Sequence, residues 1–142
     1  MGACKSFFAV LIFLVVISCN DNDGDRLKGS MKFSTVTTGT IDASHKYLFT
    51  FSGLVGDLEL PNGIELGPNS ETTIEFNRVG EILKVWVSNV PTSCPNISSK
   101  SSTGNQLTTN ANPSEPGADY ESGFLVPVNG STGTLEFTIE CN

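Results

Sequence analysis

Strict alternation of apolar and polar residues is the feature that most constrains the fold of this chain. In an extended strand such alternation places every apolar side chain on one face, which fits a sheet with one buried side. Beyond the first twenty residues, no run of ten or more shows the spacing of three and four that an amphipathic helix needs. The clearest alternating runs are 46–52, 71–76, 81–90 and 134–141. The sequence therefore predicts an all-β domain, a small antiparallel two-sheet sandwich of six or seven strands.

Turns and loops are expected between these runs. Pro61-Asn62-Gly63 has the composition of a tight turn. The segment at about 95–123 is rich in Ser, Thr, Asn and Pro, with Tyr120 as its one aromatic residue. It is predicted to be a long polar loop, serving either as a plain surface loop or as a partner-contacting one. The runs 124–128 and 134–141 are predicted to form a hairpin.

The N-terminus has the organisation of a bacterial export signal. Lys5 precedes an apolar run at 7–17, which is shorter than the roughly 20 residues that span a bilayer. The run ends in Val16-Ile17-Ser18-Cys19, which resembles the lipobox of bacterial lipoproteins, where the cysteine thiol accepts diacylglycerol. We expect a cleaved signal helix at 1–18 and lipid on Cys19. Ordinary secretion, with cleavage at the same place, is the alternative.

A second lipidation motif overlaps this signal. The start MGACKS fits N-myristoylation of Gly2, with Cys4 as a site for palmitate. Myristoylation is cytosolic, whereas the segment that follows directs export, so the lipobox is the preferred interpretation.

The cysteines support lipidation. Of the four, Cys4 leaves with the signal and Cys19 carries the lipid, so Cys94 and Cys141 remain as an even pair in an oxidising compartment. We expect a disulfide between them. No Cys or His spacing predicts a metal site, and no cofactor is expected.

The segment 19–29 is polar and acidic and predicts a lipidated tether. Its DNDGD string resembles the start of a calcium-binding loop, but Cys19 and Ser30 would occupy loop positions that need carboxylates. An acidic stretch after a lipidated cysteine also resembles the surface-export signal of lipoproteins in Bacteroidota. We expect a lipid-anchored protein of the bacterial cell envelope, in the outer membrane and displayed on its outer face.

Charge and composition exclude several functions. The net charge is −7 and the basic residues are scattered, so no nucleic-acid partner is expected. The one imidazole, His45, lies near Asp42 and Ser44, but residues so close in sequence rarely form a catalytic triad. No catalytic residues and no enzymatic activity are therefore predicted. Trp86 is expected on an outward strand face, where it either packs under the polar loop or binds a sugar or protein.

Several motifs resemble a module of bacterial exported proteins. They are TTGTID, KYLFTF, VWVSNVPTSC and GTLEFTIEC, within Ser30 to Cys141. The resemblance is to carboxypeptidase regulatory-like (prealbumin-like) and PEGA-type sandwiches. It implies an immunoglobulin-like or prealbumin-like domain, a cysteine pair at Cys94 and Cys141, no catalytic residues and a structural or adhesive role.

Three segments follow: a signal peptide at 1–18, a lipidated tether at 19–29 and a β-sandwich domain at 30–142. The predicted function is that of a non-enzymatic lipoprotein with a structural or interaction role, attached to the membrane by the lipid on Cys19. The alternative is an accessory lipoprotein that binds carbohydrate or protein through Trp86, Tyr120 and the 95–123 loop.

Overall fold

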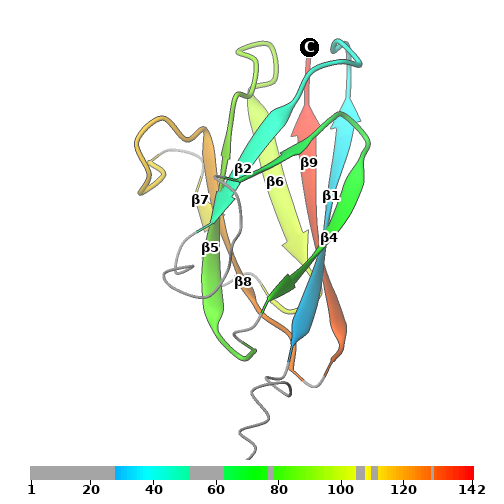
Figure 1. Cartoon of the computed structure of the whole chain (residues 1–142). Helices are drawn as coiled ribbons and strands as arrows, with labels where there is room; N and C mark the ends of the chain where they lie inside the picture. The colour runs from blue at the N-terminus through cyan, green and yellow to red at the C-terminus, as the bar shows by residue number, and fades with distance from the viewer. Residues whose placement is uncertain (1–27, 52–62, 77–78, 105–107, 110–111, 129) are drawn as a thin grey trace, which may run out of the picture.

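The protein is a β-sandwich. The computed structural model describes residues 28–51, 63–76, 79–104, 108–109, 112–128 and 130–142, which contain nine strands and no helix (Figure 1). One sheet has the order β4-β1-β9-β6 and the other β3-β2-β5-β8-β7. The strands are β1 (Gly29–Thr38), β2 (Tyr47–Phe51), β3 (Ile64–Leu66), β4 (Glu71–Phe76), β5 (Ile82–Ser88), β6 (Asn96–Ser101), β7 (Thr108–Thr109), β8 (Tyr120–Leu125) and β9 (Thr132–Glu140). The predicted all-β, two-sheet architecture is confirmed.

One strand pair departs from the predicted antiparallel arrangement. β1 and β9 run parallel, in a register that extends from Ser30 opposite Thr132 to Thr38 opposite Glu140. Alternation of apolar residues is the same in both directions of a strand. It therefore does not indicate whether two paired strands run parallel or antiparallel. Every other strand pair in the described residues is antiparallel.

The predicted hairpin of 124–128 with 134–141 is wrong. β8 belongs to the five-stranded sheet and β9 to the four-stranded sheet, so the chain crosses between sheets after Leu125. Phe124 and Leu135 are both fully buried because each points into the core from its own sheet. Two inward-facing strands joined by a short connection look alike in sequence whether they pair or face each other across the core.

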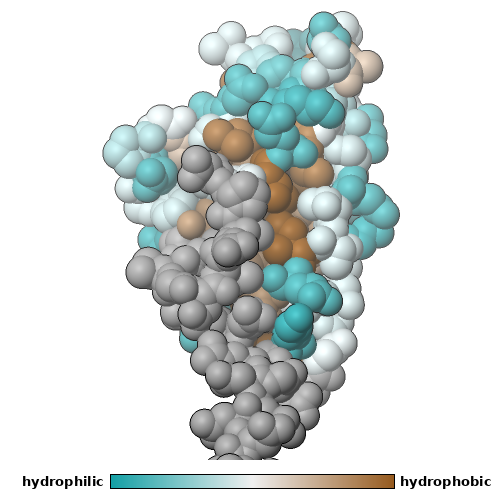
Figure 2. Space-filling model, in the orientation of Figure 1, coloured by the Kyte–Doolittle hydropathy of each residue, from teal (hydrophilic) through white to brown (hydrophobic). Residues whose placement is uncertain are grey.

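The core contains the alternating residues that the sequence assigned to inward faces. Four phenylalanine rings from four strands form its centre. The ring centroids of Phe33 and Phe51 are 5.2 Å apart, those of Phe33 and Phe124 are 5.4 Å apart, and those of Phe76 and Phe124 are 5.6 Å apart. In Figure 2, hydrophobic residues appear as a strip between the two sheets, while the top of the molecule carries hydrophilic residues.

The segment predicted as one polar loop at 95–123 contains strand structure. It includes β6, β7 and the start of β8. β6 is an edge strand of its sheet, and within it only Ile97 is a buried apolar residue. An edge strand facing solvent needs few apolar side chains, which is why a strand of Asn, Ser and Lys reads as a loop.

The two ends of the sandwich differ in what they carry. β1 and β9 both begin at the same end, where the described chain starts, and the C-terminus lies at the opposite end (Figure 1). We call these the tether end and the C-terminal end. The C-terminal end also carries the turns before β2 and after β5 (Figure 1).

A buried hydroxyl fixes the turn between β3 and β4. Thr35 is 3% exposed, and its Oγ1 donates to the Gly67 carbonyl oxygen at 2.6 Å and accepts from the Ser70 backbone N–H at 3.1 Å.

We expect Thr35→Val, which keeps the shape of the side chain and removes both hydrogen bonds, to lower the free energy of unfolding by about 1–2 kcal/mol in urea titrations. Thr73→Val, on an exposed position of β4, is the control and should change it by less than about 0.5 kcal/mol. Equal losses in the two variants would contradict this assignment.

Candidate functional site

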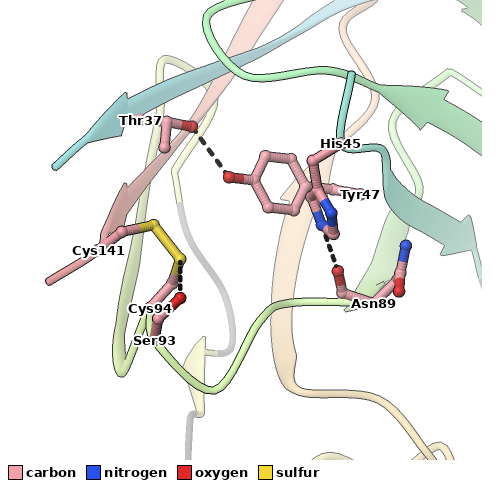
Figure 3. The surroundings of a disulfide bond; sticks show 7 residues. All are labelled: Thr37, His45, Tyr47, Asn89, Ser93, Cys94 and Cys141. Carbon is pink, nitrogen blue, oxygen red and sulfur yellow. Dashed lines mark hydrogen bonds between the residues drawn. A yellow bond between two sulfur atoms is a disulfide. The ribbon is translucent and has the colours of Figure 1, made fainter. Parts of the chain in front are cut away.

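The predicted disulfide between Cys94 and Cys141 is present (Figure 3). It joins the turn after β5 to the residue that follows β9, across 47 positions of sequence. Backbone hydrogen bonds reinforce the same junction, from Cys141 N to the Thr38 oxygen at 2.9 Å and from Asn142 N to the Ser93 oxygen at 2.8 Å. The last strand is thereby fixed to the neighbouring turn at the C-terminal end. Cys19, the predicted lipid site, lies outside the described residues.

Polar contacts near the disulfide connect the other turns of this end. His45 Nε2 donates to the Asn89 carbonyl oxygen at 2.7 Å, and the hydroxyls of Tyr47 and Thr37 are 3.2 Å apart (Figure 3). Asn89 has a φ of 63°, in the left-handed region, and its side-chain amide donates to the Lys46 carbonyl. The C-terminal end is therefore a network of fixed turns.

Asp42, Ser44 and His45 do not form a proton relay. Asp42 Oδ1 accepts from the Ser44 backbone N–H and from its hydroxyl, both at 2.8 Å, and these two bonds lower the pKa of Asp42. His45 directs its Nε2 to Asn89 instead. The geometry is that of a turn held by an aspartate, not of a nucleophile next to a base.

Trp86 lies on the outer face of the five-stranded sheet and is half-buried. It stands directly opposite Glu121 of β8, and its Nε1 donates to Glu121 Oε2 at 2.8 Å. The same N–H is 3.2 Å from the hydroxyl oxygen of Ser114, which comes from the segment before β8. The indole N–H is thus engaged by Glu121 and Ser114, while packing under the polar loop and binding of a sugar or protein both stay predictions for Trp86.

Glu121 is the centre of this group. It is 1% exposed, and Oε2 also accepts from the Ser114 backbone N–H at 2.5 Å and from its hydroxyl at 2.6 Å. Lys84 Nζ lies 3.1 Å from Oε1. Burial acts to raise the pKa of Glu121, but the hydrogen bonds from Ser114, then those from Trp86 and Lys84, outweigh it and lower the pKa to about 2. We call Lys84, Trp86, Ser114 and Glu121 the Glu121 cluster.

Glu121 is not among the site residues predicted from the sequence. Its partners lie in two separate segments: Lys84 and Trp86 in β5, which the strand register places beside β8, and Ser114 in the segment before β8. The one available signal was Trp86 itself, because a tryptophan covered by other residues needs an acceptor for its N–H. The arrangement holds the segment around Ser114 against the sheet, which is a structural task.

Tyr120 was predicted as a ligand contact, and the structure corrects this. It is fully buried, and its hydroxyl is 2.9 Å from Ser99 Oγ of β6, on the opposite sheet. Tyr120 begins β8, and its alternation with Ser122 and Phe124 points all three inward. It contributes to the core and offers no surface to a partner.

The outer face of the four-stranded sheet is the other surface of note. It carries a shallow cavity of about 500 Å³, lined among others by Lys32, Ser34, Val36, Asn69 and Glu136. Lys32 pairs with Glu71 at 2.6 Å on the same face. Within the ranges that the structure describes, no three His, Cys, Asp or Glu side chains gather into a metal-binding group. The face is lined by hydroxyls and paired charges.

No helix among the described residues is long and apolar enough to cross a membrane.

Comparison with known proteins relates the chain to a bacterial adhesin at the level of fold. No protein-family model matches, and no curated protein sequence does. Among solved structures, an adhesin from Mobiluncus mulieris that contains intramolecular disulfide, isopeptide and ester bond cross-links matches in two crystal forms. The TM-scores are 0.55 and 0.54, at 14% identity, over 80% of this chain. The chain spans 41% of the adhesin's length. The prealbumin-like and PEGA-type assignment is not confirmed, and the fold shown is a β-sandwich shared with a bacterial adhesin.

Proposed function

We propose that this chain is a lipid-anchored, non-enzymatic β-sandwich of the bacterial cell envelope, displayed on the outer surface with a structural or adhesive role. The observation that carries the proposal is that the two ends of the sandwich differ in the features that they carry. The chain enters β1 at the tether end, directly after the segment that begins with Cys19, and the disulfide-tied turns lie at the other end (Figure 1). A module attached in this way presents its C-terminal end to the surroundings.

The strand arrangement favours a mechanical task. A force between a membrane tether at Gly29 and a partner at the C-terminal end would act along β1 and β9. These strands are parallel and matched over nine positions, from Ser30 and Thr132 to Thr38 and Glu140. Such a force would load their hydrogen bonds together in shear, and the disulfide holds the end of β9 in place. The similar adhesin also contains intramolecular covalent cross-links.

The alternative, an accessory lipoprotein that binds a glycan or protein through Trp86, Tyr120 and the 95–123 segment, receives less support. The indole N–H of Trp86 is engaged by Glu121, and Tyr120 is in the core. A surface partner would instead meet the C-terminal end or the hydroxyl-lined face of the four-stranded sheet.

The anchor is tested by expressing the full chain and a Cys19→Ser variant in a bacterium that processes lipoproteins. We expect the membrane-extracted wild type to lack residues 1–18 and to carry the mass of acyl chains on Cys19, together with an intact disulfide. The Cys19→Ser variant should leave the membrane fraction. Intact-mass spectrometry and membrane flotation are the measurements.

A matched control separates anchoring from folding. The double variant Cys94→Ser/Cys141→Ser removes the disulfide without changing the lipobox and should stay with the membrane. Membrane retention of Cys19→Ser after signal cleavage, or a wild-type mass without acyl chains, would overturn the anchor and leave ordinary secretion as the explanation.

A further inference from the structure

Exposed aliphatic side chains gather at the tether end. Ile82, at the start of β5, is 56% exposed, and Val128, after β8, is 48% exposed. Gly80 links them: its backbone N–H donates to the Val126 oxygen at 2.9 Å, and a Cβ placed on it would lie 3.6 Å from Val128 Cγ1. We call Gly80, Ile82 and Val128 the tether-end patch. Among the described residues, one other large hydrophobic side chain is exposed, that of Val36, at 38%.

The chain leaves the sandwich beside this patch. Gly29, the first residue of β1, packs so closely on the segment that carries Val128 that an added Cβ would lie 2.2 Å from the Pro127 carbonyl oxygen. Nine residues separate Gly29 from Cys19. Whatever conformation they adopt, they span at most about 35 Å, close to the length of the ten-residue strand β1 itself. A lipid on Cys19 would therefore keep the tether end within this distance of the membrane.

The charges of this end do not favour an electrostatic contact. Among the described residues of this end, Lys28 and Glu75 form an exposed ion pair at 3.6 Å, and Glu81 adds a carboxylate between Gly80 and Ile82. Anionic headgroups would gain nothing from such a surface. The charges of this end are compatible with an apolar contact with the interface of a zwitterionic bilayer.

We propose that the tether-end patch rests on the lipid bilayer that carries the lipidated Cys19, so that the sandwich stands with its C-terminal end away from the membrane. This inference rests on the proposed lipid anchor. Two aliphatic side chains bind a bilayer weakly from solution. Attachment by the tether makes the contact intramolecular and raises its effective concentration. Contact with the bilayer then orients the domain, and the polar C-terminal end is the surface that is accessible to a partner.

The test uses the full lipidated protein in phosphatidylcholine vesicles whose acyl chains carry bromine, which quenches nearby tryptophan. Trp86, the one tryptophan, is replaced in a Trp86→Phe background. One reporter is Ser131→Trp, on an exposed position at the tether end, and the matched reporter is Thr92→Trp, on an exposed position at the C-terminal end. We expect quenching of the reporter at 131 and none at 92, unchanged by salt or by added anionic lipid.

The patch itself is tested by adding Ile82→Asp and Val128→Asp to the Ser131→Trp protein. Quenching should then be lost while the protein still floats with the vesicles. Equal quenching at 131 and 92, or full quenching with both aspartates, would overturn the proposal, as would self-association through the patch without vesicles. A protein that does not float with vesicles would instead contradict the lipid anchor, so the two failures are distinguishable.

Discussion

Replacing Cys94 and Cys141 together by serine is expected to lower the free energy of unfolding by about 4 kcal/mol. The disulfide closes a loop across 47 positions, and the loss of loop-closure entropy in the unfolded chain gives this magnitude. The loop includes β6, β7, β8 and β9, so strands of both sheets are constrained by one covalent bond. For a domain of this size the loss corresponds to a fall in Tm of roughly 15 °C.

Urea unfolding followed by the fluorescence of Trp86 measures the effect. The midpoint should fall, and the slope of the free energy against urea should rise, because an unfolded chain without the cross-link exposes more surface. Wild-type protein treated with reductant is the control, and it should reproduce the double variant. A midpoint that does not respond to reductant would show that the native packing around the buried Cys94 carries the stability without the bond.

Much of the core could be predicted from the sequence, because the side-chain period of a strand is a local property. Tyr47, Phe49, Val85, Phe137 and Ile139 each belong to a set of apolar residues that recurs at every second position of a strand, and all five are fully buried. Burial of one sheet face is enough to produce this pattern. It predicts the class of fold without any knowledge of which strand lies beside which.

Strand pairing could not be predicted, because it depends on residues distant in sequence. Nothing in β1 indicates that its neighbour is β9 or that the two run parallel. The edge strand β6 contributes one buried apolar residue, Ile97, and a serine that meets Tyr120 and Ser122 across the core. Polar contacts between sheets leave no alternation of hydrophobicity to detect.

The same limit applies to the candidate site. The disulfide followed from counting cysteines in an exported chain, and this needed no geometry. The Glu121 cluster required the register of β5 with β8 and the return of Ser114 over the sheet. The prediction that Tyr120 contacts a ligand was wrong for a related reason. The composition of its segment predicts a loop, whereas Tyr120 begins strand β8.

Replacing Glu121 by glutamine is expected to lower the free energy of unfolding by about 2–3 kcal/mol at neutral pH. The amide has one acceptor oxygen, so its NH₂ group must face donors that one carboxylate oxygen had satisfied: either the Lys84 ammonium at Oε1 or the Trp86 indole and the Ser114 amide at Oε2. Hydrogen bonds to a buried charge are stronger than neutral ones, and an unsatisfied buried donor adds its desolvation cost. Urea titration at pH 7 is the measurement.

The pH dependence of this difference identifies the carboxylate as its source. The pKa of Glu121 is about 2 in the folded protein and near its usual 4.5 in the unfolded chain. Because the folded pKa is the lower one, the stabilisation is complete above about pH 5 and is lost as the pH falls from 4.5 towards 2. The difference in the free energy of unfolding between wild type and Glu121→Gln should therefore become smaller as the pH falls from 4.5 towards 2.

A matched control distinguishes this effect from general acid unfolding. Glu136→Gln removes an exposed glutamate from the outer face of β9 and should change the free energy of unfolding by less than about 0.5 kcal/mol at pH 7. Other carboxylates titrate in wild type and in Glu121→Gln alike, so their contribution cancels in the comparison. If the gap between the two proteins stayed constant from pH 7 to pH 2.5, the loss would come from altered packing of the Ser114 segment and not from the charge of Glu121.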